Sequence, residues 1–357
     1  MAHRRKIIIH GASPRRKKKH KKSRKRRHLY IIGNGFDLHH FIPSKYEHFR
    51  DWLEEHNEDT LFRIEEILET DEPTWWNEFE TNLGRGYAVK LYAESVAFQN
   101  QPDYSSDDYR DRDLYVAEYE VERNIGDLIC DLKSDFQEWA SQLPIGDGGR
   151  AIKMETKGSS FLTFNYTLTL EKLYNVPSKQ ILHIHGHALD KDTIIVGHGR
   201  DYGSFRNELD DDLPEPPDDM SSEEYERWFD EVVSDFSDDY PTSQAKDAAA
   251  TAMVKLRKDV DGIIAKNKDF FQSLHDIGTI HVYGLSFADV DIPYLMEVAN
   301  NVDIGNVEIE ISYYKDEDKV KSEMFMELVE PRPKNVKFVK LEELMRYREL
   351  ELFEGVE

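Results

Sequence analysis

The chain has 357 residues, enough for one large α/β domain with insertions or for two smaller domains. Its hydrophobic fraction of 39% can fill a core, but no uninterrupted apolar run approaches the roughly 20 residues of a membrane-spanning helix, and no secretory signal is visible. A single cysteine, Cys130, excludes an intramolecular disulfide framework and a cysteine zinc site, so we expect a cytoplasmic protein.

The net charge of −24 is divided unevenly along the chain. Residues 1–29 contain 14 Lys and Arg and no Asp or Glu, which leaves 33 basic and 71 acidic side chains in the remainder. Such an acidic body repels nucleic acid, so we expect no nucleic-acid partner for it. Residues 1–28 lack periodic apolar positions apart from Ile7–Ile9, and we predict a disordered basic arm that could bind nucleic acid or anionic lipid. This arm is either native, an added extension or the product of a misplaced start.

The first predicted strand is His28–Ile32, which leads directly into the glycine turn Gly33–Asp37 (GNGFD). Apolar residues at intervals of three and four then predict helices within Tyr46–Leu68 and Ile125–Leu143. Because these helices separate the first strand from the later ones, we predict a helical insertion at about residues 44–158.

Short apolar runs bounded by turn residues predict the remaining strands. These strands are Ser159–Tyr166, Ile181–Gly186, Thr193–Gly199, Thr279–Ser286, Val307–Tyr314 and Val336–Leu341. Helices are predicted in TLTLEKLY and at Leu341–Phe353. The stretch Arg206–Pro241 is rich in Asp, Glu and Pro, which indicates an acidic insertion or mobile lid within about residues 201–275. Strands that alternate with helices predict an α/β fold, a Rossmann-like, doubly wound and mostly parallel sheet with helical insertions.

Ligands of an open α/β sheet bind beyond the carboxyl ends of its strands, where this sequence places several unusual residues. Gly33 and Gly35 permit close backbone approach to a phosphate, or they form only a tight strand-to-helix turn. Asn165 follows an apolar strand, where its amide could bind a sugar hydroxyl or a carboxamide, or simply cap a helix. Gly284 and Ser286 follow a later strand and suit either a ligand contact or an ordinary helix cap.

Histidines mark another predicted strand end, and they are His183, His185, His187 and His198. Alternation along a strand predicts that His183 and His185 point to the same face, with His185 beside the turn at Gly186. A histidine at a strand end suits a general base. The four histidines could instead form a metal site, although no carboxylate partner stands at a recognisable spacing.

Six motifs follow one another in a specific order between about residues 30 and 294. They are YIIGNGFDLHH, WWNEFETNLG, FLTFNYTLTLEKLY, ILHIHGHA, IIVGHG and GLSFADVDIPY. Together they resemble the bacteriophage abortive infection AbiH family. More distantly, their order resembles the sirtuin-like NAD-consuming domains, in which a glycine loop, an Asn, a His-Gly pair and a G-x-S segment surround NAD. The resemblance implies a sirtuin-like domain over residues 29–357 that acts in anti-phage defence.

The resemblance also implies roles for individual residues. It places Gly33, Asn34, Gly35 and Asp37 at the diphosphate of NAD, Asn165 and His185 at the reacting ribose as catalytic residues, and Gly284 and Ser286 at the adenosine half. Sirtuins favour Ala and a small hydroxyl residue where this chain has Asn34 and Phe36-Asp37, and they usually place an Asp near the position of Thr167. The chain also has no zinc-binding cysteine module, and these differences argue against protein deacylation.

We therefore predict hydrolysis of NAD to nicotinamide and ADP-ribose, without a required cofactor. Nicotinamide leaves as a neutral ring, so the site must mainly stabilise an oxocarbenium-like ribose and present water. Asn165 would orient ribose and water, and His185 would accept a proton. Activity could need a homo-oligomer or a phage trigger, and no membrane partner is expected. Two alternatives stay open: a nucleotide-sensing binding module that acts through a partner, and a metal-dependent hydrolase or nuclease that uses His183, His185, His187 and His198.

Overall fold

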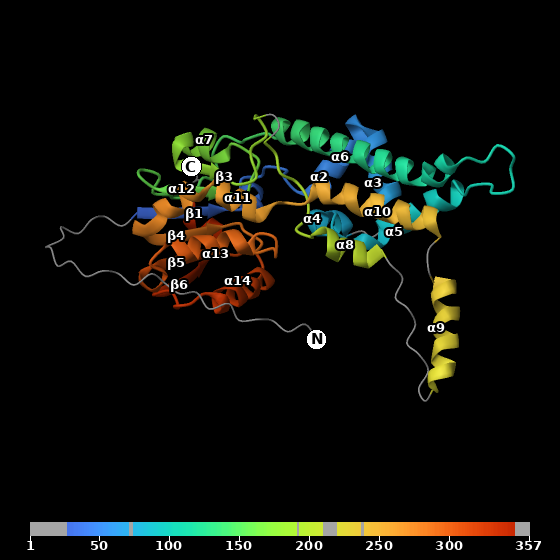
Figure 1. Ribbon diagram of the computed structural model, residues 1–357. Helices are drawn as coiled ribbons and strands as arrows, with labels where there is room; N and C mark the ends of the chain where they lie inside the picture. The colour runs from blue at the N-terminus through green and yellow to red at the C-terminus, as the bar shows by residue number, and fades with distance from the viewer. Residues whose placement is uncertain (1–26, 71–73, 191–192, 210–219, 237–238, 347–357) are drawn as a thin grey trace, which may run out of the picture. The chain divides into compact units, whose positions relative to one another are not determined.

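The computed structural model describes residues 27–70, 74–190, 193–209, 220–236 and 239–346 (Figure 1). These residues group into two compact units. The sheet unit contains the described parts of Met1–His48, Gln137–Ile195 and Asp259–Glu357, and the helical unit contains those of Phe49–Phe136 and Val196–Lys258. Across these described ranges, every helix is too short or too polar to cross a membrane.

The sheet unit is built on one six-stranded sheet with the order β3-β2-β1-β4-β5-β6. Its strands are β1 (Arg27–Ile32), β2 (Ser160–Thr163), β3 (Ile181–His183), β4 (Ile277–Tyr283), β5 (Glu308–Ser312) and β6 (Asn335–Val339). Every neighbouring pair is parallel. Rossmann folds have this strand order. β2 and β3 lie on one side of β1, and the chain then crosses to the other side, where β4, β5 and β6 follow. The predicted Rossmann-like α/β fold is confirmed, with a wholly parallel sheet.

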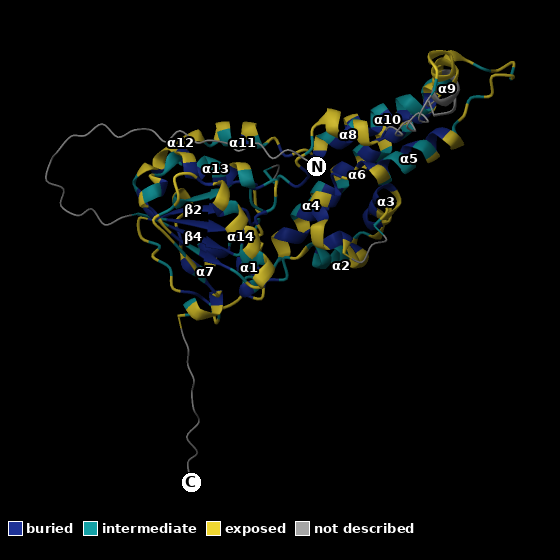
Figure 2. Ribbon diagram, turned by 90° about the horizontal axis from the view of Figure 1, so that it is seen from below, coloured by how far each residue is buried: buried dark blue, intermediate teal, exposed yellow. Residues whose placement is uncertain are grey.

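Alternation along β1 divides the core between the two faces of the sheet. Leu29 and Ile31 lie in an apolar cluster with residues of four later helices, whereas Tyr30 and Ile32 lie in a second cluster with residues of two others. The first face carries α11 (Val260–Lys266), α12 (Lys268–Gln272), α13 (Ile292–Asn301) and α14 (Asp316–Leu328), and the second carries α1 (Asn34–His39) and α7 (Thr169–Tyr174). Figure 2 shows the buried strands between these helices.

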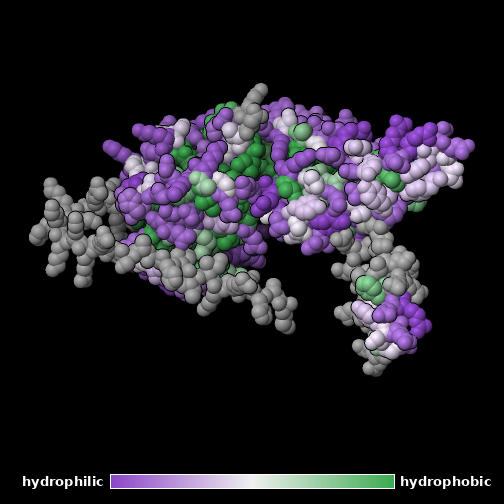
Figure 3. Space-filling model, viewed as in Figure 1, coloured by the Kyte–Doolittle hydropathy of each residue, from purple (hydrophilic) through white to green (hydrophobic). Residues whose placement is uncertain are grey.

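The helical unit draws on both predicted insertions. Its helices are α3 (Glu58–Leu68), α4 (Phe79–Asn82), α5 (Gly86–Gln99), α8 (Tyr202–Leu209), α9 (Ser222–Phe236) and α10 (Tyr240–Met253), with most of α2 (Tyr46–His56) and α6 (Val116–Gln142). In its core the ring of Phe49 packs edge-on against Phe79 and Phe136, with centroids 6.3 and 5.2 Å apart. Residues 44–48, 137–158 and 259–275, which also fall within the predicted insertions, belong to the sheet unit. The face in Figure 3 is largely hydrophilic, as the 33% of charged residues leads one to expect.

Three predicted segments differ from the structure. The predicted arm extends to residue 28, but Arg27 and His28 lie in β1, and residues 1–26 lie outside the described residues. The segment Thr193–Gly199 forms no strand where one is predicted. It forms only an isolated parallel bridge between His198 and Arg257, in which the N–H of His198 donates to the carbonyl of Leu256 at 3.0 Å. Of the helix predicted at Leu341–Phe353, residues 341–344 form a 3-10 turn, and the part from residue 347 lies outside the described residues.

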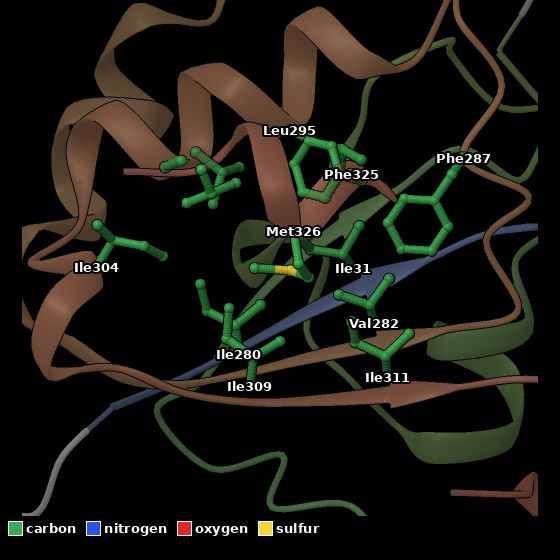
Figure 4. Close-up of a pocket in the computed structure, with 13 residues that line it drawn as sticks. Ile31, Ile280, Val282, Phe287, Leu295, Ile304, Ile309, Ile311, Phe325 and Met326 are labelled. Atoms are coloured by element: carbon green, nitrogen blue, oxygen red, sulfur yellow. The ribbon is translucent and has the colours of Figure 1, made fainter. Parts of the chain in front are cut away.

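A small apolar cavity of about 30 Å³ lies between the sheet and the helices α13 and α14 (Figure 4). Ile31, Val282 and Ile311 line it from the strands, and Leu295 and Met326 line it from the helices. The lining offers no hydrogen-bond partner for water, so a site of this kind stays dry and leaves side-chain contacts unmade.

The cavity gives a prediction about stability. Val282→Ile adds one methyl group to the lining, and we expect it to raise the free energy of unfolding by about 1 kcal/mol. Ile311→Val removes a methyl group from the same lining and should lower that free energy by about 0.5–1.5 kcal/mol. Urea unfolding of both variants checks the pair. A loss of stability in Val282→Ile would show that the added methyl group strains its neighbours.

Candidate functional site

Three neighbouring strands bring a group of polar side chains to one edge of the sheet. Asp37 lies in α1 after the end of β1, Asn165 follows β2, and His183 ends β3. Because β1, β2 and β3 are adjacent and parallel, their carboxyl ends meet at the same edge, as they do in ligand sites of open α/β sheets. All three residues belong to the sheet unit.

Asp37 is a buried carboxylate held by two threonine hydroxyls. It is 1% exposed, and it accepts hydrogen bonds from Oγ1 of Thr167 at 2.6 Å and of Thr169 at 2.8 Å. Burial raises the pKa of Asp37 to about 6, although the two hydroxyls, the nearby amide of Asn165 and the charge of His183 all act to lower it. The side chain predicted at the diphosphate loop thus lies in a buried polar cluster.

Asn165 offers an amide that the described protein leaves without a partner. The residue is 6% exposed, and neither Oδ1 nor Nδ2 makes a close hydrogen bond within the described ranges, although the amide lies near enough to Asp37 to lower the pKa of that carboxyl. Its main-chain N–H donates to Oγ1 of Thr163 at 3.1 Å, which fixes the backbone at the end of β2. Buried amides are nearly always hydrogen-bonded, so this one is available to an ordered water or a ligand.

His183 lies beside a carboxylate that was not predicted from the sequence. Its Nε2 is 2.9 Å from Oε1 of Glu171, and its Nδ1 is 3.3 Å from the main-chain oxygen of Asn165. The ring centroid of His187 is 5.1 Å from that of His183. Glu171 lies in the first turn of α7, the helix that follows Asn165.

His185 does not share the surroundings of His183. β3 ends at His183, so His185 is not on a strand, and the predicted common face is wrong. Its ring is 3% exposed and packs edge-on against Phe164 and Tyr294, with centroids 5.5 and 5.6 Å apart. Gly186 adopts φ +76°, and a Cβ there would lie 2.2 Å from the main-chain oxygen of Thr193. This turn therefore requires glycine and ends the strand early.

The glycines at the ends of β1 and β4 pack against each other. The N–H of Gly33 donates to the carbonyl of Tyr283 at 3.0 Å, and that of Gly35 to the carbonyl of Gly284 at 2.8 Å. Gly284 has φ +66°, and a Cβ on it would lie 2.0 Å from the main-chain nitrogen of Phe36. Close packing of two turns thus explains these three glycines, and the N–H groups of Gly33 and Gly35 are already engaged.

The other two residues predicted to contact the ligand lie near these turns on the surface. Asn34 is exposed, and its side chain donates to the carbonyl of Ser44 at 2.9 Å and accepts from the hydroxyl of Ser44 at 2.5 Å. Ser286 is also exposed. Neither side chain is buried as those of Asp37 and Asn165 are, so the predicted residues fall into two groups.

His198 is a structural histidine of the helical unit. Its Nδ1 accepts from the N–H of Arg200 at 3.1 Å, and its Nε2 lies 3.1 Å from the carbonyl of Met253. Burial lowers the pKa of His198, which favours the neutral ring that these two bonds need. Neither ring nitrogen is open to a metal. Within the described ranges, the structure contains no group of three or more His, Cys, Asp or Glu arranged to hold one.

Comparison with known proteins gives one match. The family model described as "Bacteriophage abortive infection AbiH" matches residues 29–313, which include the whole polar cluster and both glycine turns. No curated protein and no solved structure matches the chain.

Proposed function

This chain belongs to the bacteriophage abortive infection AbiH family and acts in anti-phage defence, and we propose that it does so by hydrolysing NAD to nicotinamide and ADP-ribose. The observation that carries the proposal is the unpartnered, buried amide of Asn165 at the carboxyl edge of a sheet with the Rossmann strand order. Such an edge is where dinucleotides bind in folds of this order. The neighbouring Asp37 and His183 supply further polar groups beside this amide.

The reaction replaces one bond to the ribose by another. The bond between C1′ and the nicotinamide nitrogen breaks, and its electron pair neutralises the pyridinium ring. The oxygen of water forms the new bond to C1′ and gives up a proton. In our proposal the Asn165 amide orients the ribose and the water, and His185 accepts that proton. Positioning of this kind is a large part of catalysis when the leaving group needs no protonation.

Two residues that depart from the sirtuin pattern in this region contact each other. Sirtuins favour a small hydroxyl residue in the glycine loop and an Asp after the catalytic Asn, whereas this chain has Asp37 and Thr167. Oγ1 of Thr167 donates to the Asp37 carboxylate at 2.6 Å. A carboxylate and a hydroxyl thus face each other in this region.

The glycine turns have a smaller role in this proposal than the family resemblance implies. The N–H groups of Gly33 and Gly35 are bonded to the end of β4, so we do not assign the diphosphate to them. The exposed Asn34 and Ser286, which lie beside these turns, are the proposed contacts for the diphosphate and the adenosine half.

The proposal predicts that the purified protein releases nicotinamide from NAD without added metal. Release is measured by chromatography, with and without EDTA, and in the presence of a phage lysate in case a trigger is needed. We expect equal rates with and without the chelator. Loss of release in EDTA that returns with zinc or manganese would replace this proposal by a metal-dependent hydrolase.

A further inference from the structure

The His183 ring lies between two oxygen acceptors. Its Nε2 faces Oε1 of Glu171 at 2.9 Å, and its Nδ1 faces the main-chain oxygen of Asn165 at 3.3 Å. A carboxylate and a carbonyl accept hydrogen bonds and cannot donate them. Both bonds therefore form together only when each ring nitrogen carries a proton, as in the imidazolium ion.

Two acidic side chains and a second histidine lie around this ring. Asp37 on α1 lies near enough to His183 for the charge of His183 to lower the pKa of Asp37. Glu171 on α7 forms an ion pair with His183. His187 follows β3 in the chain, and its ring centroid is 5.1 Å from that of His183. The side chains of His183 and Glu171 are 10% and 18% exposed, so solvent screens their attraction less than it would at the surface.

The residues around the ring also keep polar atoms that the described protein does not satisfy. They are Oδ1 and Nδ2 of Asn165, Oε2 of Glu171 and Nδ1 of His187, all of which are buried and have no hydrogen-bond partner in the described ranges. Native proteins leave few such atoms unpaired, and those that remain usually meet water or a ligand. A ligand with several polar groups would satisfy atoms on all three residues around His183.

We propose that Glu171 and His183 form a positioning pair: Glu171 anchors an imidazolium at His183, which holds the main chain of Asn165 so that its amide meets the ribose of the substrate. The hydrogen bond from His183 to Asn165 ties the end of β3 to the end of β2. The effect of the positioning pair on turnover rests on the proposed function. That function assigns no role in the reaction to Glu171.

Substitutions at position 183 separate a charged anchor from a merely bulky side chain. His183→Lys keeps a cation with three donors and no acceptor, whereas His183→Gln keeps a polar side chain without the charge. We expect His183→Gln to lower kcat for nicotinamide release about 100-fold with little change in KM, because small displacements of reacting groups have effects of that order. His183→Lys should lower kcat by no more than about tenfold, and Glu171→Gln should lower kcat as much as His183→Gln does.

His275→Gln is the matched control, since His275 is an exposed histidine of the same unit, and its kcat should equal that of the wild type. Melting temperatures establish that each variant is folded. If folded His183→Lys and His183→Gln proteins lose the same activity, a cation at this position is not required, and the inference is wrong.

Nitrogen NMR of the full chain with ring-labelled histidines tests the pair without any turnover. The His183 signals are identified by their loss in His183→Lys. We expect both ring nitrogens of His183 to carry protons at neutral pH, and to lose that state in Glu171→Gln. A neutral His183 ring overturns the inference whether or not NAD is hydrolysed. A doubly protonated ring in a protein that leaves NAD intact rejects the proposed function and retains the pair.

Discussion

Replacement of Asn165 or His185 by alanine is expected to abolish most nicotinamide release. Loss of a general base lowers rates by about 10²–10⁴-fold, and we expect this range for His185→Ala. Asn165→Ala removes an amide that has no partner in the described protein, so it should lower turnover by at least about 100-fold and leave the fold intact. Turnover with saturating NAD and the melting temperature are measured for both proteins.

The location of His185 calls for a second variant. Its ring is buried against Phe164 and Tyr294, so truncation to alanine also leaves a cavity. His185→Asn fills more of that space but is a poor proton acceptor, and it should lose as much activity as His185→Ala while melting at a higher temperature. Near wild-type turnover in either folded variant would remove His185 from the chemistry.

Replacement of Asp37 by asparagine is expected to stabilise the protein at neutral pH. Burial raises the pKa of Asp37 from 3.8 to about 6. The folded state therefore binds this proton more tightly than the unfolded state. The resulting stabilisation is full below pH 3.8 and is lost as the pH rises through about 6. A rise of the pKa from 3.8 to about 6 corresponds to about 3 kcal/mol. In the Asp37→Asn variant, the side chain at this position carries no charge at any of these pH values.

Urea unfolding between about pH 4 and about pH 8 measures this effect. The free energy of unfolding of Asp37→Asn, relative to the wild type, should increase by about 3 kcal/mol across that range. An asparagine side chain can accept from one of the threonine hydroxyls and donate to the other, so the local hydrogen bonds can be kept. Asp269→Asn, at an exposed position of the same unit, should show no such trend. If the free energy of unfolding of Asp37→Asn relative to the wild type does not change with pH, then Asp37 is ionised over this whole pH range in the folded protein.

The fold could be predicted because the strands of the sheet unit are continuous apolar runs separated by helical patterns. In β1, both Leu29 and Tyr30 are buried, one on each face, so the run signals a strand inside a parallel sheet. The same signal failed at Thr193–Gly199, where an apolar run pairs with a loop. Local composition does not specify which backbone a segment will meet.

The site could be predicted only in part. The position of Asn165 after an apolar strand placed it correctly at the sheet edge, because strand ends are visible in sequence. The different surroundings of His183 and His185 were not visible, because β3 stops at His183 and the left-handed Gly186 directly follows His185. Glu171 was missed because its contact with His183 depends on α7 lying beside β3, which only the tertiary structure shows.

The products of NAD incubated with the protein in isotopically labelled water test the central claim most directly. Cleavage of the glycosidic bond by water predicts equal amounts of nicotinamide and ADP-ribose, with one labelled oxygen at C1′ of the ADP-ribose and none in nicotinamide. Recovery of AMP and nicotinamide mononucleotide, with the label in a phosphate group, would contradict the account by showing that the diphosphate is the bond attacked.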